Sequence, residues 1–215
     1  MRIVGIDPSL NGFGVVELNW PSPNPTRTAL FKTPPSMVFV DRYTTQRERL
    51  MAFLREAPPD AVGIESPPFG ASFSEGMYAL FVMTNEALRS LNMNVVFFGP
   101  TQVKQHAHEY LHRPAGWKML KPDLIEAARK SSGIGKWNHN IADAHRIGLM
   151  AGRFWAFLDG TLSKADLTPV ELDLFTRSHT YTRGKKAGKT EKSGLIYREN
   201  DRFFRWSVGS SGHTP

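Results

Sequence analysis

Short apolar runs, separated by residues typical of turns, occupy much of the first hundred positions of the chain. Residues 2–6 and 61–64 are β-branched and apolar, which predicts buried strands. A strand pattern also covers residues 12–18, and we predict two further strands over residues 37–43 and 95–98. Prolines punctuate the segment before residue 37, so we interpret that segment as a long loop.

Apolar residues at helical spacing predict helices between and after these strands. The predicted helices cover residues 45–54, 74–91, 101–111, 122–130 and 140–158, and one more helix is expected within residues 162–176. Three strands in a hairpin-like run, followed by strand–helix units, indicate a mixed sheet flanked by helices. This order predicts an α/β (mixed) or α+β architecture.

The composition is that of a globular protein. The chain has 215 residues, of which 40% are hydrophobic and 22% are charged, and this excludes a disordered chain. No apolar run reaches the ~18 residues of a membrane span, so we expect no membrane partner. The absence of cysteine excludes disulfides, thiolate metal sites and a cysteine nucleophile, and it is compatible with a reducing, cytoplasmic location.

Basic residues are concentrated near the C-terminus. The formal net charge is +7, from 27 Lys and Arg against 20 Asp and Glu. Residues 177–206 hold nine of the basic residues and three of the acidic ones, a net +6, which leaves +1 for the rest of the chain. Such an excess indicates a polyanionic partner.

Three carboxylates are candidate functional groups, and two of them follow predicted strands at the sheet edge where open sheets typically place their sites. Asp7 directly follows the predicted strand of residues 2–6, and Glu65 directly follows that of residues 61–64. Asp143 is in line with an apolar stripe that steps by three and four along the last long helix, formed by Ile147, Met150, Phe154 and Phe157. A turn-forming Asp–Pro pair and a helix-start carboxylate are the structural alternatives for Asp7 and Asp143.

This trio of acids indicates a metal site. Carboxylates from distant segments repel one another unless a cation neutralises them, and oxygen donors without thiolates suit Mg²⁺ or Mn²⁺. Divalent ions held by carboxylates beside a basic surface indicate phosphodiester hydrolysis, in which one ion activates water and another stabilises the leaving oxygen. His139 lies one helical turn before Asp143, so it is a further candidate ligand.

Three sequence motifs occur in a fixed order along the chain. Residues 5–16 read GIDPSLNGFGVV, residues 61–65 read AVGIE, and residues 140–144 read NIADA. Together they resemble the RuvC-type Holliday junction resolvases of the RNase H-like superfamily, with Ser9 where that family has glycine. The resemblance implies an RNase H-like nuclease domain over residues 1–158, followed by a basic C-terminal extension over residues 159–215.

The resemblance implies a site with four metal ligands, which are Asp7, Glu65, Asn140 and Asp143. Asn140 stands where the family usually has Asp and sometimes His, so either its carbonyl binds the metal or His139 assists. We favour Asn140 because it shares the stripe with Asp143. The implied cofactor is Mg²⁺, with Mn²⁺ as the alternative, and two ions in each site.

The resemblance also implies residues that contact DNA. Phe69 resembles a loop aromatic that stacks at the unpaired centre of a junction, whereas Phe73 is first of all a core candidate. Lys104, in a helix that starts with proline, resembles a lysine near the scissile phosphate. Lys118 and Lys121 resemble a later basic pair, and a solvated surface charge is the alternative for each lysine.

We therefore predict a magnesium-dependent, structure-selective endonuclease that resolves four-way junctions, with branched DNA as its partner. The helix of residues 74–91 resembles the one through which such resolvases form homodimers, and ordinary core packing is the alternative for its stripe. Small size and an added tail suit a phage-encoded member acting in a bacterial cytoplasm. The alternative functions are a related nuclease cutting RNA–DNA hybrids or flaps, an actin- or sugar-kinase-type nucleotide-binding domain, and a non-catalytic DNA-binding relic.

Overall fold

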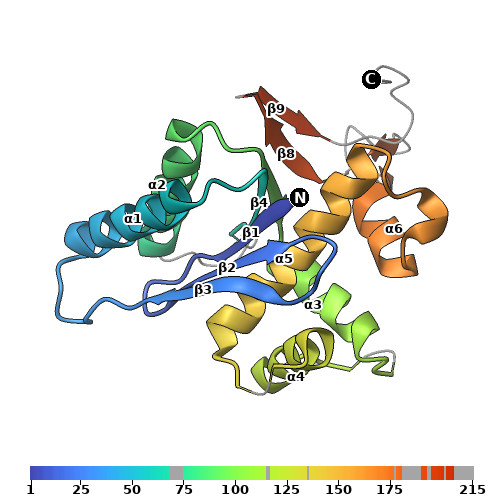
Figure 1. Ribbon diagram of the computed structural model, residues 1–215, viewed down its shortest axis with the longest axis horizontal. Coiled ribbons are helices and arrows are strands. Elements are labelled where there is room, and N and C mark those ends of the chain that lie inside the picture. The colour runs from blue at the N-terminus through green and yellow to red at the C-terminus, as the bar shows by residue number, and fades with distance from the viewer. Residues whose placement is uncertain are drawn as a thin grey trace.

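A mixed β-sheet forms the centre of the protein (Figure 1). The computed structural model describes residues 1–67, 75–114, 117–134, 136–176, 178–180, 190–192, 195–200 and 202–205. Within these residues one sheet has the strand order β3-β2-β1-β4-β5-β8-β9, and β6 and β7 form a separate pair. The strands are β1 (Arg2–Asp7), β2 (Phe13–Asn19), β3 (Pro25–Phe31), β4 (Ala61–Glu65), β5 (Val95–Phe98), β6 (Ser178–Thr180), β7 (Thr190–Lys192), β8 (Ile196–Glu199) and β9 (Arg202–Arg205).

Helices cover both faces of this sheet. Helices α1 and α2 pack together on one face, while α5 crosses β1, β2 and β4 on the other (Figure 1). No helix of the described residues is long and apolar enough to cross a membrane. The helices are α1 (Phe39–Glu56), α2 (Glu75–Ser90), α3 (Pro100–Tyr110), α4 (Lys121–Ser132), α5 (His139–Leu158), the 3₁₀ helix η1 (Lys164–Asp166) and α6 (Pro169–Thr176).

Alternation along the central strands assigns their side chains to the two faces. Val4 and Ile6 of β1 pack with residues of α1 and α2, whereas Ile3 packs with residues of α5. By the same alternation, Asp7 lies on the α5 face of β1. Glu65 lies on that face of the parallel neighbour β4, so the sheet places both carboxylates beneath α5.

Glycines let α5 lie directly against the sheet. Gly5 of β1 and Gly63 of β4 are register partners in the parallel pair. A Cβ atom added to Gly5 would lie 2.0 Å from the carbonyl oxygen of Ala144, and one added to Gly14 of β2 would lie 2.3 Å from that of Asn140. Larger residues at these positions would push away the N-terminal half of α5, which carries the predicted site residues.

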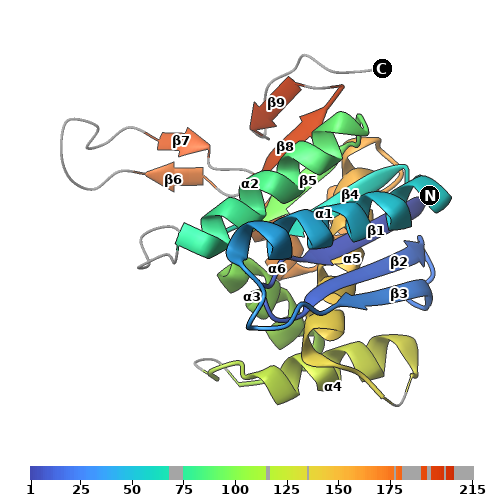
Figure 2. The same cartoon turned by 90° about the vertical axis from the view of Figure 1, so that its left-hand side faces the viewer.

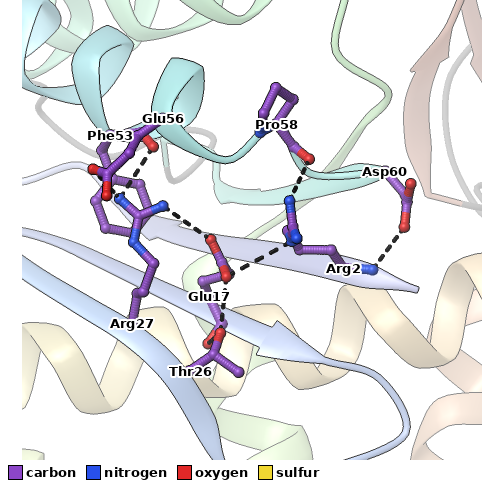
Figure 3. A network of polar contacts seen from close by, with 8 residues as sticks. All are labelled: Arg2, Glu17, Thr26, Arg27, Phe53, Glu56, Pro58 and Asp60. Carbon is purple, nitrogen blue, oxygen red and sulfur yellow. Dashed lines mark hydrogen bonds and ion pairs between the residues drawn. The ribbon is translucent and has the colours of Figure 1, made fainter.

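A polar network fixes the C-terminal end of α1 to the sheet (Figure 3). Glu17 of β2 is buried, and it accepts hydrogen bonds from Thr26 Oγ1 at 2.9 Å and from Arg27 Nη1 at 3.3 Å. Arg27 of β3 also donates to the Phe53 carbonyl oxygen and to Glu56 of α1. Charge-assisted bonds of this kind hold α1 in a fixed position over the sheet.

The structure has the predicted mixed sheet flanked by helices, but the strand predicted over residues 37–43 is wrong. The third strand, β3, lies within the segment interpreted as a loop, and α1 begins at Phe39. β3 is an edge strand whose residues are largely half-exposed or exposed, so its sequence lacks a clear apolar pattern. Pro25 is its first residue, a position where a strand tolerates the missing N–H.

Part of the chain beyond residue 158 packs on the preceding elements. β8 pairs antiparallel with β5, and Leu195 and Tyr197 belong to the buried cluster that contains Phe154 of α5. Glu171 of α6 is buried, and its Oε1 lies 3.0 Å from His106 Nε2 of α3. The division into a domain of residues 1–158 and an extension of residues 159–215 stays a prediction, and these contacts join the two parts.

Candidate functional site

Three carboxyl groups meet at one edge of the sheet. Asp7 and Glu65 are the last residues of the parallel neighbours β1 and β4, and Asp143 lies in the second turn of α5. All three line one pocket of about 250 Å³. The other residues that line it are Pro8, Ser9, Ser66, Pro67, Met77, Phe81, Pro100, Lys121, His139 and Asn140.

Burial raises the pKa of every carboxyl group in this trio. The pKa of Asp7 lies well above its usual range because the group is buried and because Glu65 and Asp143 carry like charge. Burial and the charge of Asp143 raise the pKa of Glu65 to about 7, and burial raises that of Asp143 to about 6. Asp7 and Glu65 also hydrogen-bond to each other, which requires a proton on one of them.

Two lysines act on the trio from α3 and α4. Lys121 is the first residue of α4 and lines the pocket, and its charge lowers the pKa of Asp7 and Asp143. Lys104 of α3 lowers the pKa of Glu65 and Asp143 in the same way. These effects are smaller than that of burial, so the trio remains a concentration of acid groups with a positive rim.

The first turn of α5 contributes two more candidate ligands, because His139 and Asn140 both line the pocket. The helix begins after Asn138, whose side-chain oxygen accepts a hydrogen bond from the Asn140 N–H at 2.9 Å. A Cβ atom added to Gly12 would lie 2.2 Å from Asn140 Nδ2, so the amide lies tightly against the loop after β1. Burial, together with the charge of Lys121, lowers the pKa of His139.

The chemistry of this donor set fits a hard divalent cation. Asp143 Oδ1 is buried and has no hydrogen-bond partner among the residues that the structure describes. In that part of the chain no group of three His, Cys, Asp or Glu side chains is already arranged to hold a metal ion. A bound cation would offset the repulsion among the three carboxylates. The residues that would hold Mg²⁺ are therefore Asp7, Glu65 and Asp143, with Asn140 or His139.

The remaining predicted DNA contacts lie away from the pocket or cannot be placed. Phe69 and Phe73 fall outside the described residues, so their stacking at a branch point stays a prediction. Lys118 is exposed in the segment before α4 and is not one of the residues that line the pocket.

Two residues of α1 that were not predicted to support the site hold the loop between Asp7 and Gly12 in place. Arg42 is buried and donates from Nη2 to the Leu10 carbonyl oxygen at 2.7 Å and to Asn11 Oδ1 at 2.9 Å. Gln46 Nε2 donates to the carbonyl oxygens of Ser9 and Leu10 at 3.2 and 3.1 Å. A signal for both exists in the sequence, since Arg42 and Gln46 continue the stripe of Leu50 at steps of four.

Comparisons with known proteins identify structures that share this architecture. No protein-family model matches the chain, and no curated protein is similar to it in sequence. RuvC from Thermus thermophilus, in complex with Holliday junction substrate, matches with a TM-score of 0.59 and 22% identity, over 75% of this chain and 97% of that chain. A second T. thermophilus RuvC structure matches with a TM-score of 0.59 and 21% identity, over 75% and 98%. Fowlpox virus resolvase with substrate Holliday junction DNA gives a TM-score of 0.40 and 14% identity, over 68% and 95%.

The likeness to RuvC covers most of both chains. It spans nearly the whole of RuvC and leaves about a quarter of the present chain uncovered. Sequence identity is low, but the TM-score of 0.59 over that length indicates a shared fold. The RNase H-like fold expected from three short motifs is therefore confirmed, and this chain has the fold of RuvC.

Proposed function

We propose that this protein is a magnesium-dependent endonuclease that resolves four-way DNA junctions. The observation that carries the proposal is the convergence of Asp7, Glu65 and Asp143 in one pocket, within reach of the charges of Lys104 and Lys121. Carboxylates with raised pKa values in a pocket mark candidate functional sites. The RuvC structure that shares this fold contains Holliday junction substrate, which supports the same substrate class here.

Each group in the pocket has a distinct part in the proposed hydrolysis. Asp7, Glu65 and Asp143 would hold Mg²⁺, which when bound supplies an activated water and stabilises the leaving oxygen. Lys121 lines the pocket and attracts the scissile phosphate, while Lys104 adds positive charge from α3. Positive groups fixed in advance near a phosphodiester stabilise the charge that develops in the transition state.

We propose Asn140, rather than His139, as the fourth ligand. Asn140 shares with Asp143 the row of α5 that faces the sheet, and its amide packs against the loop after β1. The carbonyl oxygen of an amide is a ligand that hard cations accept. Outside the pocket, Phe69 is proposed to stack at the branch point and Lys118 to contact phosphates, with Phe73 as a secondary candidate.

We also propose that the protein forms a homodimer through α2. Tyr78 and Val82 are four residues apart and therefore lie on the same face of this helix. Their side chains are 61% and 40% exposed. Val38, Phe39 and Val40, at the start of the neighbouring α1, are more than half exposed. A two-fold dimer would present two pockets to two strands of a four-way junction. Light scattering at micromolar concentration measures this state directly.

Cleavage of a defined set of DNA substrates tests the proposed function. The set comprises a synthetic four-way junction, a matched linear duplex, a flap and an RNA–DNA hybrid, each with Mg²⁺ or with EDTA under single-turnover conditions. We expect nicking of the junction only, and only with Mg²⁺. Asp7→Asn should slow it by about a thousandfold or more while leaving junction affinity within about threefold, because a metal ligand acts mainly in the transition state.

Asp60→Asn is the matched control for this substitution. Asp60 is exposed immediately before β4, where its Oδ2 accepts a hydrogen bond from the Arg2 N–H, and an asparagine oxygen retains that bond. Its cleavage rate should equal that of the unaltered protein. Magnesium-dependent cutting that survives Asp7→Asn would remove Asp7 from the site, and faster cutting of hybrids or flaps would replace the junction as substrate.

A further inference from the structure

The segment that leads into α4 exposes large apolar side chains beside lysines. Trp117 and Leu120 are 48% and 55% exposed, and Lys118 and Lys121 are exposed as well. Met119 alone of residues 117–121 is buried, in a small cluster with residues of α3 and α4. Exposed aromatic residues interleaved with lysines are typical of surfaces that bind single-stranded nucleic acid.

Trp117 is held in position even though half of it is exposed. Its N–H donates to the Pro114 carbonyl oxygen at 3.1 Å, and its indole Nε1 lies 3.5 Å from Asp123 Oδ2. The same Asp123 oxygen accepts a hydrogen bond from the Leu120 N–H at 2.8 Å, which lowers the pKa of Asp123. The Arg113 guanidinium carbon lies 5.2 Å from the centroid of the Trp117 ring. These contacts fix the orientation of the Trp117 ring, so the side chain loses little conformational freedom when a base stacks on it.

The segment runs directly to the carboxylate pocket. Lys121 lines that pocket, and its charge acts on Asp7 and Asp143. Trp117 precedes it by four residues, which places their Cα atoms within about 14 Å of each other. A DNA strand covers this distance in about four base steps of ~3.4 Å. One strand can therefore place a phosphate in the pocket and a nearby base at Trp117.

We propose that Trp117 is a stacking platform for an unpaired base of the strand that is cut, with Lys118 contacting a phosphate of the same strand. Charge favours this occupant, because Lys118 and Lys121 flank the apolar surface with positive charge. The inference rests on the proposed function and deepens it. It adds a DNA contact on the α4 side of the pocket, whereas Phe69 belongs to the segment between β4 and α2.

Two substitutions separate stacking from a merely structural role. Trp117→Phe keeps an aromatic face but loses the indole N–H near Asp123, whereas Trp117→Leu keeps apolar volume without an aromatic face. Fluorescence polarisation in EDTA measures the affinity of each full-length variant for a four-way junction and for a matched duplex. We expect Trp117→Leu to weaken junction binding about tenfold, with duplex binding within about twofold, and Trp117→Phe to remain within about threefold of the unaltered protein.

Photo-cross-linking of the unaltered protein gives a test that does not depend on whether the variants fold. A junction carrying 5-iododeoxyuridine at the branch nucleotides should cross-link to Trp117 on irradiation, and mass spectrometry of the peptides identifies the cross-linked residue. Equal junction affinity of Trp117→Leu and the unaltered protein, or equal weakening in Trp117→Leu and Trp117→Phe, would overturn the inference alone. Failure of the unaltered protein to prefer junctions over duplex would overturn the proposed function as well.

Discussion

Asp7, Glu65 and Asp143 each cost more free energy to bury than neutral amides of the same shape. Carboxyl groups in unfolded chains have pKa values near 4. In the folded protein the pKa of Glu65 rises to about 7 and that of Asp143 to about 6, chiefly through burial. A group whose pKa rises on folding binds more protons in the folded state, so stability is present below pH 4 and is lost as pH rises through the folded pKa. The metal-free fold therefore carries unfavourable charge at neutral pH.

Asp143→Asn should stabilise the metal-free protein increasingly from pH 4 to pH 7. Below pH 4 the carboxyl is protonated in both the folded and the unfolded protein and resembles the amide, so the difference in stability between the two proteins should not change with pH. At pH 8 the variant should have gained about 3 kcal/mol over its value below pH 4, since a rise of two pKa units at ~1.4 kcal/mol each corresponds to roughly that free energy. Thermal unfolding in EDTA across this range measures the difference. Glu48→Gln, at an exposed position of α1, is the control and should give a difference independent of pH; an equally flat difference for Asp143→Asn would contradict the raised pKa.

At the scale of single elements, local patterns predict the ends of β1 and β4 and the face of α5 on which Asp143 lies. Each carboxylate there closes an apolar run or continues an apolar stripe, and parallel pairing brings the strand ends together. The support from α1 escapes prediction, because a strand over residues 37–43 removes Arg42 from the helix. The hydrogen bonds from Arg42 to the loop after β1 also join residues more than thirty positions apart, and no local pattern encodes such partners.

Arg42→Lys should disturb the loop after β1 without altering the carboxylates themselves. Lysine keeps the charge but loses the fork that bonds the Leu10 carbonyl oxygen, Asn11 and Thr33 together. We expect a decrease of about 1–3 kcal/mol in the free energy of unfolding and slower single-turnover cleavage at unchanged junction affinity. Urea unfolding and rapid-quench cleavage measure these quantities.

Arg49→Lys makes the same chemical change on the same helix, at an exposed residue that bonds only the Lys32 carbonyl oxygen in the described part of the chain. It should change the free energy of unfolding by less than about 0.5 kcal/mol and leave cleavage unaffected. Equal effects of the two substitutions would show that the loop needs no support from α1.

The whole molecule combines a nearly neutral body with a basic C-terminal part. Figure 2 shows the β6–β7 hairpin projecting from the body on the same side as the N-terminal ends of α2 and α4. The chain between these two strands includes Arg183, Lys185, Lys186 and Lys189. Removing everything after residue 176 would also remove β8, whose Tyr197 is part of the core, so truncation would change the charge and the packing together.

Neutralising these lysines in place tests the role of the basic part in binding DNA. The triple variant carries Lys185→Gln, Lys186→Gln and Lys189→Gln. Its slope of log affinity against log salt concentration should become shallower by about 0.9 for each phosphate that is no longer neutralised. The largest expected change, for three phosphates, is about 2.7. Junction and duplex should be affected alike, because interactions with phosphates carry little structural preference. A control with the same reduction in charge at the exposed residues Lys32, Arg55 and Lys164 should keep the original slope. Equal slopes in the two triple variants would mean that the basic excess lies outside the DNA interface and that the body alone binds the phosphates.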